Sequence, residues 1–157
     1  MKRHEVAELF ESLRRVARSG QVGQPVFLRC QVTGPPERAV TVLAEALAAA
    51  AALFDNSPET LQAAGDEAAG ALHAVLIFRS GSTVLAYVGP GEETVDVMLL
   101  GNHGAAYGPA VPVPPHPRSA RFLATGVADE AAHQFVALIR RSLSTRRPVR
   151  WEAGRDA

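Results

Sequence analysis

Three strand-like segments follow one another between residues 72 and 100, and they constrain the fold more than any other feature of the sequence. The first, Leu72 to Arg79, is apolar at nearly every position, which is typical of a central strand covered on both faces. Thr83 to Val88 and Thr94 to Leu100 follow after short turns that contain glycine. Turns of this kind join antiparallel neighbours, so the three segments predict an antiparallel meander.

The segments around this meander predict helices and further strands. Glu5 to Arg18, Glu37 to Phe54 and Glu130 to Leu143 carry apolar residues at helical spacing, while Pro25 to Thr33 alternates as a strand does. The remaining predicted elements are a short helix from Ser57 to Ala64, a strand from Ser119 to Gly126, and a short edge strand within Arg146 to Trp151.

This order of elements predicts an α+β fold, with a mostly antiparallel sheet of four to five strands and helices packed on one face. The chain has 157 residues and no break in composition, so a single domain is expected over 1–157, with a frayed tail over 152–157. Because 47% of the residues are hydrophobic and 20% are charged, the chain can bury a core without disulfides or metals.

Charge and cysteine content limit the possible partners and locations. The formal net charge is zero, which removes the strongest argument for binding nucleic acid or a membrane surface. Cys30 is the only cysteine, and its place in an apolar strand favours a small buried hydrophobe over a reactive thiol. The charged start is unlike a signal peptide and no apolar run is long enough to span a bilayer, so a soluble, cytoplasmic protein is expected.

The sequence contains none of the common catalytic or cofactor motifs. It has no Walker loop, no Gly-x-Gly-x-x-Gly, no Gly-x-Ser-x-Gly, no His-Glu-x-x-His and no pair of cysteines for zinc. No cofactor and no metal site are therefore predicted, and the case for an enzyme is weakened without being excluded. The histidines lie far apart along the chain, without the spacing of metal ligands, at His4, His73, His103, His116 and His133.

Gly101 to Arg118 is rich in glycine and proline and is predicted to be a long loop without regular structure. Long loops in compact domains are usually functional or disordered. Within this one, Asn102, His103 and Tyr107 are candidate ligand contacts; His103 is a candidate acid/base group and His116 a second titrating group. The alternative is that the glycines and prolines only shape a surface connection.

The one clear basic cluster lies near the C-terminus and combines arginines with a tryptophan, as Arg146, Arg147, Arg150 and Trp151. Such a cluster could dock a protein partner, because arginine and tryptophan are enriched at binding hot spots. It could also stack on bases, or simply complement the negative end of the preceding helix. An acidic stretch from Asp55 to Glu67 would suit self-association with this cluster.

Three functional hypotheses follow from these observations. The first is a non-enzymatic protein-interaction module, acting as an accessory, adaptor or chaperone-like partner and self-associating, as a homodimer, through Arg146, Arg147, Arg150 and Trp151. The alternative is a small-molecule-binding protein or enzyme that uses residues 101–117 with His103 as acid/base. A second alternative is weak nucleic-acid binding by the C-terminal arginines, which the predicted strands disfavour because they lack paired exposed aromatic residues.

Overall fold

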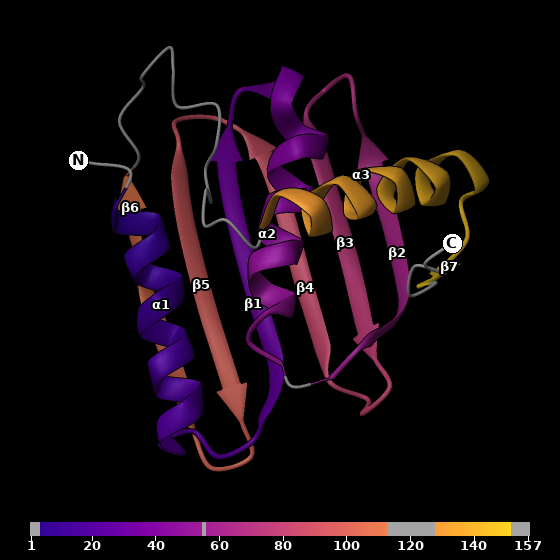
Figure 1. Ribbon diagram of the computed structural model, residues 1–157. Coiled ribbons are helices and arrows are strands. Elements are labelled where there is room, and N and C mark those ends of the chain that lie inside the picture. The colour runs from indigo at the N-terminus through magenta and orange to yellow at the C-terminus, as the bar shows by residue number, and fades with distance from the viewer. Residues whose placement is uncertain (1–3, 55, 113–127, 152–157) are drawn as a thin grey trace.

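A computed structural model describes residues 4–54, 56–112 and 128–151, and it contains one twisted sheet with helices along one side (Figure 1). The helical elements of this described part are α1 (His4–Ser19), η1 (Pro36–Arg38), α2 (Ala39–Ala51) and α3 (Ala128–Thr145). The strands are β1 (Pro25–Gly34), β2 (Pro58–Asp66), β3 (Ala71–Phe78), β4 (Thr83–Pro90), β5 (Thr94–Gly101), β6 (Ala105–Pro112) and β7 (Val149–Arg150).

The fold is of the mixed α+β class, as predicted, but the sheet is larger than the predicted one and is partly parallel. Its strand order is β6-β5-β1-β4-β3-β2-β7, with seven strands instead of four to five. β1 and β4 run parallel, and every other neighbouring pair is antiparallel. A parallel pair needs a long crossover, and η1 and then α2 follow β1 at the start of that crossover.

The predicted meander is half right. β3 and β4 form an antiparallel hairpin, but β5 pairs with β1, and β1 separates β5 from β4. The β4–β5 connection passes over the end of β1, where the Gly91 N–H donates to the Gly34 carbonyl at 3.3 Å. Thr33 also bonds this connection through its hydroxyl, which donates to the Glu92 carbonyl. A short turn between two strands therefore does not guarantee that they are neighbours.

Two other predictions of local structure are wrong. The short helix predicted from Ser57 to Ala64 is strand β2, in which Leu61 and Ala63 are buried and alternate with the exposed Gln62. Pairing with β3 along its whole length outweighs the local signal for a helix start. The first part of the predicted loop is strand β6, which tolerates its prolines because it lies at the sheet edge.

The remaining predicted elements agree with the structure where the structure describes them. The strands predicted over 25–33, 72–79 and 83–88 and the helices predicted over 5–18, 37–54 and 130–143 appear with small shifts at their ends. The predicted edge strand near the C-terminus is β7. The strand predicted over 119–126, the end of the predicted loop and the tail over 152–157 lie outside the described residues.

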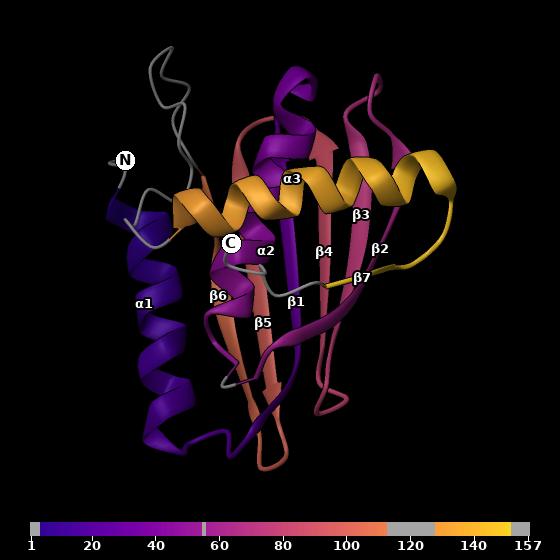
Figure 2. The ribbon, with the colours of Figure 1, turned by 45° about the vertical axis from the view of Figure 1, so that its right-hand side comes forward.

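The core lies between the sheet and the helices. In the middle of β1 to β5 alternate residues are buried, and α2, which contacts β1, β3 and β4, has nine buried residues, of which five are alanine. Small side chains let this helix approach its neighbours closely, while Leu28, Leu43 and Leu76 are fully buried in the same core. α3 crosses over α2 and reaches β2 (Figures 1 and 2).

Candidate functional site

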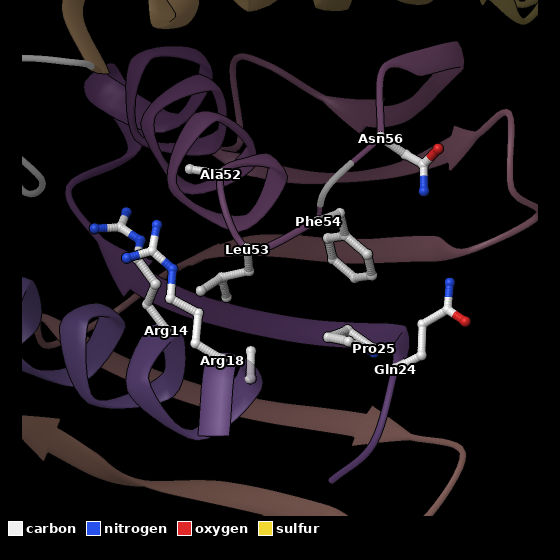
Figure 3. A pocket seen from close by; sticks show the side chains of 9 residues that line it. Arg14, Arg18, Gln24, Pro25, Ala52, Leu53, Phe54 and Asn56 are labelled. Atoms are coloured by element: carbon white, nitrogen blue, oxygen red, sulfur yellow. The ribbon is translucent and has the colours of Figure 1, made fainter. Parts of the chain in front are cut away.

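A small open pocket lies where α1 and α2 end and β1 begins (Figure 3). Its volume is about 90 Å³. Three separate segments build it, and none of them was singled out from the sequence as a site. The lining residues are Arg14, Ala17 and Arg18 of α1, Gln24 and Pro25 at the start of β1, and Ala52, Leu53, Phe54 and Asn56 after α2.

The floor of the pocket is apolar and anchored in the core. Leu53 and Phe54 are buried, with 6% and 8% of their surface exposed. The Phe54 ring stacks on Phe78 of β3, with ring centroids 4.7 Å apart and planes tilted by 25°. Because this stack joins the end of α2 to the sheet, the floor is a rigid surface on which a ligand can pack.

Polar side chains stand on two sides of this floor. Figure 3 shows Arg14 and Arg18 together on one side, and Gln24 and Asn56 on the other. The Arg14 side chain is 25% exposed and pairs with Glu11 on the same helix. In the ranges that the structure describes, no carboxylate pairs with Arg18, which leaves its guanidinium available to a ligand.

The sequence carried only a weak signal for these two arginines. Arg14 and Arg18 are four residues apart, so they lie on one face of α1. Cations in the last turns of a helix are common, because they complement the partial negative charge of the helix C-terminus. The meeting of this face with the end of α2 is a tertiary contact that helical spacing alone does not reveal.

The turn between β5 and β6 holds the Gln24 side of the pocket in place. The Asn102 side-chain Oδ1 accepts a hydrogen bond from the Gln24 N–H at 2.8 Å, and the Asn102 N–H donates to the Gln24 carbonyl at 3.1 Å. The His103 N–H donates to the Val22 carbonyl at 3.0 Å. Asn102, predicted as a ligand contact, is therefore placed as a residue that positions Gln24.

Gly23 completes this junction, because no other residue fits there. Its φ is +70°, and a Cβ added to it would lie 2.0 Å from the Asn102 Oδ1 and 2.9 Å from the His103 ring. The exposed His103 ring thus packs on Gly23, one residue from the pocket-lining Gln24. His103 itself does not line the pocket.

The structure does not bring the other candidates from the predicted loop to this pocket. Tyr107 is 71% exposed on β6, where it pairs with Met98 on the face of the sheet that carries no helix. His116 lies outside the described residues.

The C-terminal cluster is divided between the surface and the core. Arg146, Arg147 and Arg150 are exposed, but Trp151 is half-buried. Its ring packs against Phe135 of α3, with centroids 4.8 Å apart, and the backbone N–H of Trp151 donates to the Glu59 carbonyl at 2.7 Å. Trp151 therefore closes one edge of the core and does not form an exposed stacking surface with the arginines.

Cys30 is buried on β1, as predicted. Burial, with a smaller contribution from the charge of Asp96, raises the pKa of its thiol from the ordinary 9.0 to about 12.

Across the described ranges, no three His, Cys, Asp or Glu side chains gather where they could hold a metal ion. None of the helices in those ranges is both long and apolar enough to cross a bilayer.

Comparison with known proteins gives a likeness of fold only. No protein-family model matches the sequence, and no curated protein matches it. Among solved structures, GenD2 from gentamicin A biosynthesis in complex with NAD has a TM-score of 0.71 and 16% identity, over 94% of this chain and 61% of that one. A myo-inositol dehydrogenase from Lactobacillus casei in complex with NAD(H) and myo-inositol has a TM-score of 0.68 and 15% identity, over 97% and 61%. A probable dehydrogenase from Thermotoga maritima has a TM-score of 0.69 and 14% identity, over 94% and 63%.

These likenesses correct the first functional hypothesis. A non-enzymatic adaptor docking through Arg146, Arg147, Arg150 and Trp151 is wrong, because the chain shares its fold with solved dehydrogenases, one of them in complex with NAD(H) and myo-inositol. The small-molecule alternative agrees better with them. The chain spans less than two thirds of the length of these structures.

The residues of this chain do not fit a dinucleotide in the usual way. A dinucleotide-binding fold holds the pyrophosphate with the N–H groups of a glycine-rich turn between a strand and a helix of a mostly parallel sheet. Here β1 is followed by Pro35 and Pro36, which have no N–H to donate, and β1–β4 is the only parallel pair among the described strands. The β2–β3 turn also fills the adjacent space, since a Cβ on Gly70 would lie 2.4 Å from Pro36.

Proposed function

We propose that this chain is a small-molecule-binding domain that holds a small carboxylate ligand in the pocket between the ends of α1 and α2. One observation carries the proposal: Arg14 and Arg18 stand opposite Gln24 and Asn56 across an apolar floor. The fold likeness to dehydrogenases supports a small molecule as the ligand, and no redox step is assigned to the chain.

The chemistry of the lining selects a carboxylate. A guanidinium presents parallel N–H donors that match the two oxygens of a carboxylate, and such charge-assisted bonds are about twice as strong as neutral ones. Arg14 is already paired with Glu11, so Arg18 would make the main ionic contact. The amides of Gln24 and Asn56 can each donate and accept, which suits hydroxyl groups on the rest of the ligand.

The size of the pocket limits what it can enclose. Pockets for drug-sized ligands have volumes of about 300–1,000 Å³, against about 90 Å³ here. The pocket would therefore take the carboxylate and a few carbon atoms, with Leu53 and Phe54 packing against the carbons. The remainder of the ligand would extend through the open mouth toward Gln24.

The proposal keeps His103 as the acid/base candidate, because the turn that carries it is bonded to the Gln24 segment. Replacement of His103 by Gln tests this candidate, and it should leave the fold intact because the side chain is exposed. Ligand binding and turnover that are both unchanged in His103→Gln would remove His103 from the proposal.

The binding proposal is tested by isothermal titration of the purified chain with acetate, lactate and D-glucuronate, and with neutral myo-inositol for comparison. We expect at least one carboxylate to bind more tightly than myo-inositol, and to weaken as salt is added. Arg18→Ala should weaken that binding by about ten- to a hundredfold, because a charged hydrogen bond contributes about 1.5–3 kcal/mol.

Arg15→Ala is the matched control, because it removes the same charge from an exposed position on the same helix that does not line the pocket. It should bind like the unmodified chain. The proposal fails if none of the carboxylates binds, or if Arg18→Ala and Arg15→Ala have the same effect.

A further inference from the structure

The face of the sheet opposite the helices is bare in the described part of the chain. All three α-helices lie on one side of the sheet (Figures 1 and 2), and on the central strands the side chains that point to the other side are exposed or half-buried. A sheet with one face in water normally alternates apolar residues toward the core with polar residues toward solvent. This sheet departs from that pattern on its central strands.

The strand registers bring apolar side chains together on this outer face. One row across the sheet runs from Met98 through Arg29 and Leu85 to Val75. The next row runs from Leu100 through Phe27 and Thr83 to Ile77. We call the apolar members of these two rows the outer patch, which consists of Phe27, Val75, Ile77, Leu85, Met98 and Leu100.

Exposure points to the same face. The four large hydrophobic residues that are most exposed in the described ranges are Val26, Ile77, Tyr87 and Tyr107. The register places three of them on the outer face: Ile77 in the patch, Tyr87 opposite His73, and Tyr107 opposite Met98. A monomeric protein rarely concentrates its exposed large apolar residues on one side.

The area of this face is sufficient for a stable contact. Neighbouring strands lie about 4.8 Å apart and alternate residues on one face about 6.7 Å apart, so five strands and three to four rows span about 24 by 25 Å. That footprint is about 600 Å² on each molecule, or about 1,200 Å² for two. Specific interfaces bury more than about 1,000 Å² in total.

The charges on this face suit a second copy of the same surface. β3 and β4, in the middle of the sheet, contain no Asp, Glu, Lys or Arg. The central charges are Arg29 and Asp96, which pair at 3.0 Å and are 44% and 37% exposed. Two such faces meet without repulsion, because each carries one acid and one base side by side. In a twofold arrangement, Arg29 of each molecule can also reach Asp96 of the other.

From these observations we infer that the outer face of the sheet, centred on the outer patch, is the interface between two copies of this chain, packed sheet against sheet. The geometry is that of a β-sandwich, in which two sheets stack about 10 Å apart and their facing side chains interdigitate. The inference is independent of the ligand pocket, which lies at the end of the sheet among the helix termini. It also differs from self-association through the C-terminal arginines.

The test is the mass in solution of the full chain, measured by light scattering as the protein is diluted from about 100 µM to about 1 µM, the range in which a micromolar dimer dissociates. We expect twice the chain mass of 16.6 kDa at the high end. Ile77→Arg places a charge in the patch and should give a monomer at all these concentrations. Ala137→Arg places the same charge at an exposed position of α3, and it should leave the dimer intact.

Circular dichroism of each variant shows whether it is folded, and Leu85→Arg provides a second patch variant if Ile77→Arg is not. Unmodified protein that is monomeric at about 100 µM overturns the inference. A dimer that persists in a folded patch variant, or that Ala137→Arg disrupts equally, also overturns it, because the interface would then lie elsewhere.

Discussion

Replacement of Ser142 by Ala should destabilise the protein far more than the loss of one hydroxyl suggests. Strand β7 pairs with β2 only at Thr60 and Leu61, so β7 offers no partner for the backbone of Ala63, two residues further along β2. Ser142 of α3 provides that partner. Its hydroxyl accepts a hydrogen bond from the Ala63 N–H at 2.9 Å and donates one to the Arg147 carbonyl at 2.8 Å.

The expected magnitude follows from the burial of these groups. Ser142 is fully buried, with 0% of its surface exposed. Alanine would leave the Ala63 N–H without an acceptor, at a cost of about 1–3 kcal/mol. Arg147 is exposed, so water can compensate its carbonyl in part. We therefore expect a total loss of about 2–3 kcal/mol, which lowers the melting temperature of a chain of this size by about 4–10 °C.

The assay is thermal and denaturant unfolding followed by circular dichroism, with Ser144→Ala as control. The Ser144 hydroxyl is exposed and bonds only the Arg141 carbonyl of its own helix, at 2.9 Å, so its loss should stay within about 0.5 kcal/mol. Hydrogen exchange at the Ala63 amide should also accelerate in Ser142→Ala. A melting temperature within about 1 °C of the unmodified chain would refute the assigned role of Ser142 at the sheet edge.

Two further predictions concern the junction beside the pocket and the buried thiol. Gly23→Ala should unfold more easily than Gly20→Ala in denaturant: both positions have positive φ, but only the Cβ at Gly23 collides with Asn102, and equal effects would contradict that contact. Below pH 9 the Cys30 thiol should add no pH dependence to the free energy of unfolding, because it is neutral in both the folded and the unfolded chain. This free energy should then fall as pH rises from about 9 toward about 12, because the thiol ionises first in the unfolded chain, by at most about 1.4 kcal/mol per pH unit. Cys30→Ala should abolish this slope, and an identical slope in both proteins would disprove its origin.

Local sequence patterns correctly predicted the elements whose secondary structure is determined by nearby residues. The three helices and the strands β1, β4 and β5 have apolar residues at regular spacing, and β3 is a short apolar run; tertiary contacts do not oppose these local signals. Strand β2 was predicted as a helix because Ser57-Pro58-Glu59 is a good helix start, yet its pairing with β3 decides its structure. The insertion of β1 between β4 and β5 depends on contacts far apart in sequence, which periodicity does not encode.

The candidate site was predictable only in part. The glycine-rich turn at Asn102 and His103 was recognised, and the structure places it beside the pocket as a support for Gln24. The pocket itself needs α1, the start of β1 and the end of α2 to meet. The individual signals, such as Arg14 and Arg18 four residues apart on a helix, have an ordinary explanation until the fold brings them next to Asn56.

The most direct test of the central claim is a nitrogen-15 NMR titration with the carboxylate that binds most tightly, observing side-chain amide and guanidinium signals. Binding in the pocket predicts that the Gln24 and Asn56 side-chain NH₂ signals and the Arg18 Nε–H signal shift together. In Arg18→Ala the two amide signals should no longer shift at the same ligand concentration. Ligand-dependent shifts that leave Gln24 and Asn56 unchanged and appear elsewhere on the molecule would contradict the assignment of this pocket as the binding site.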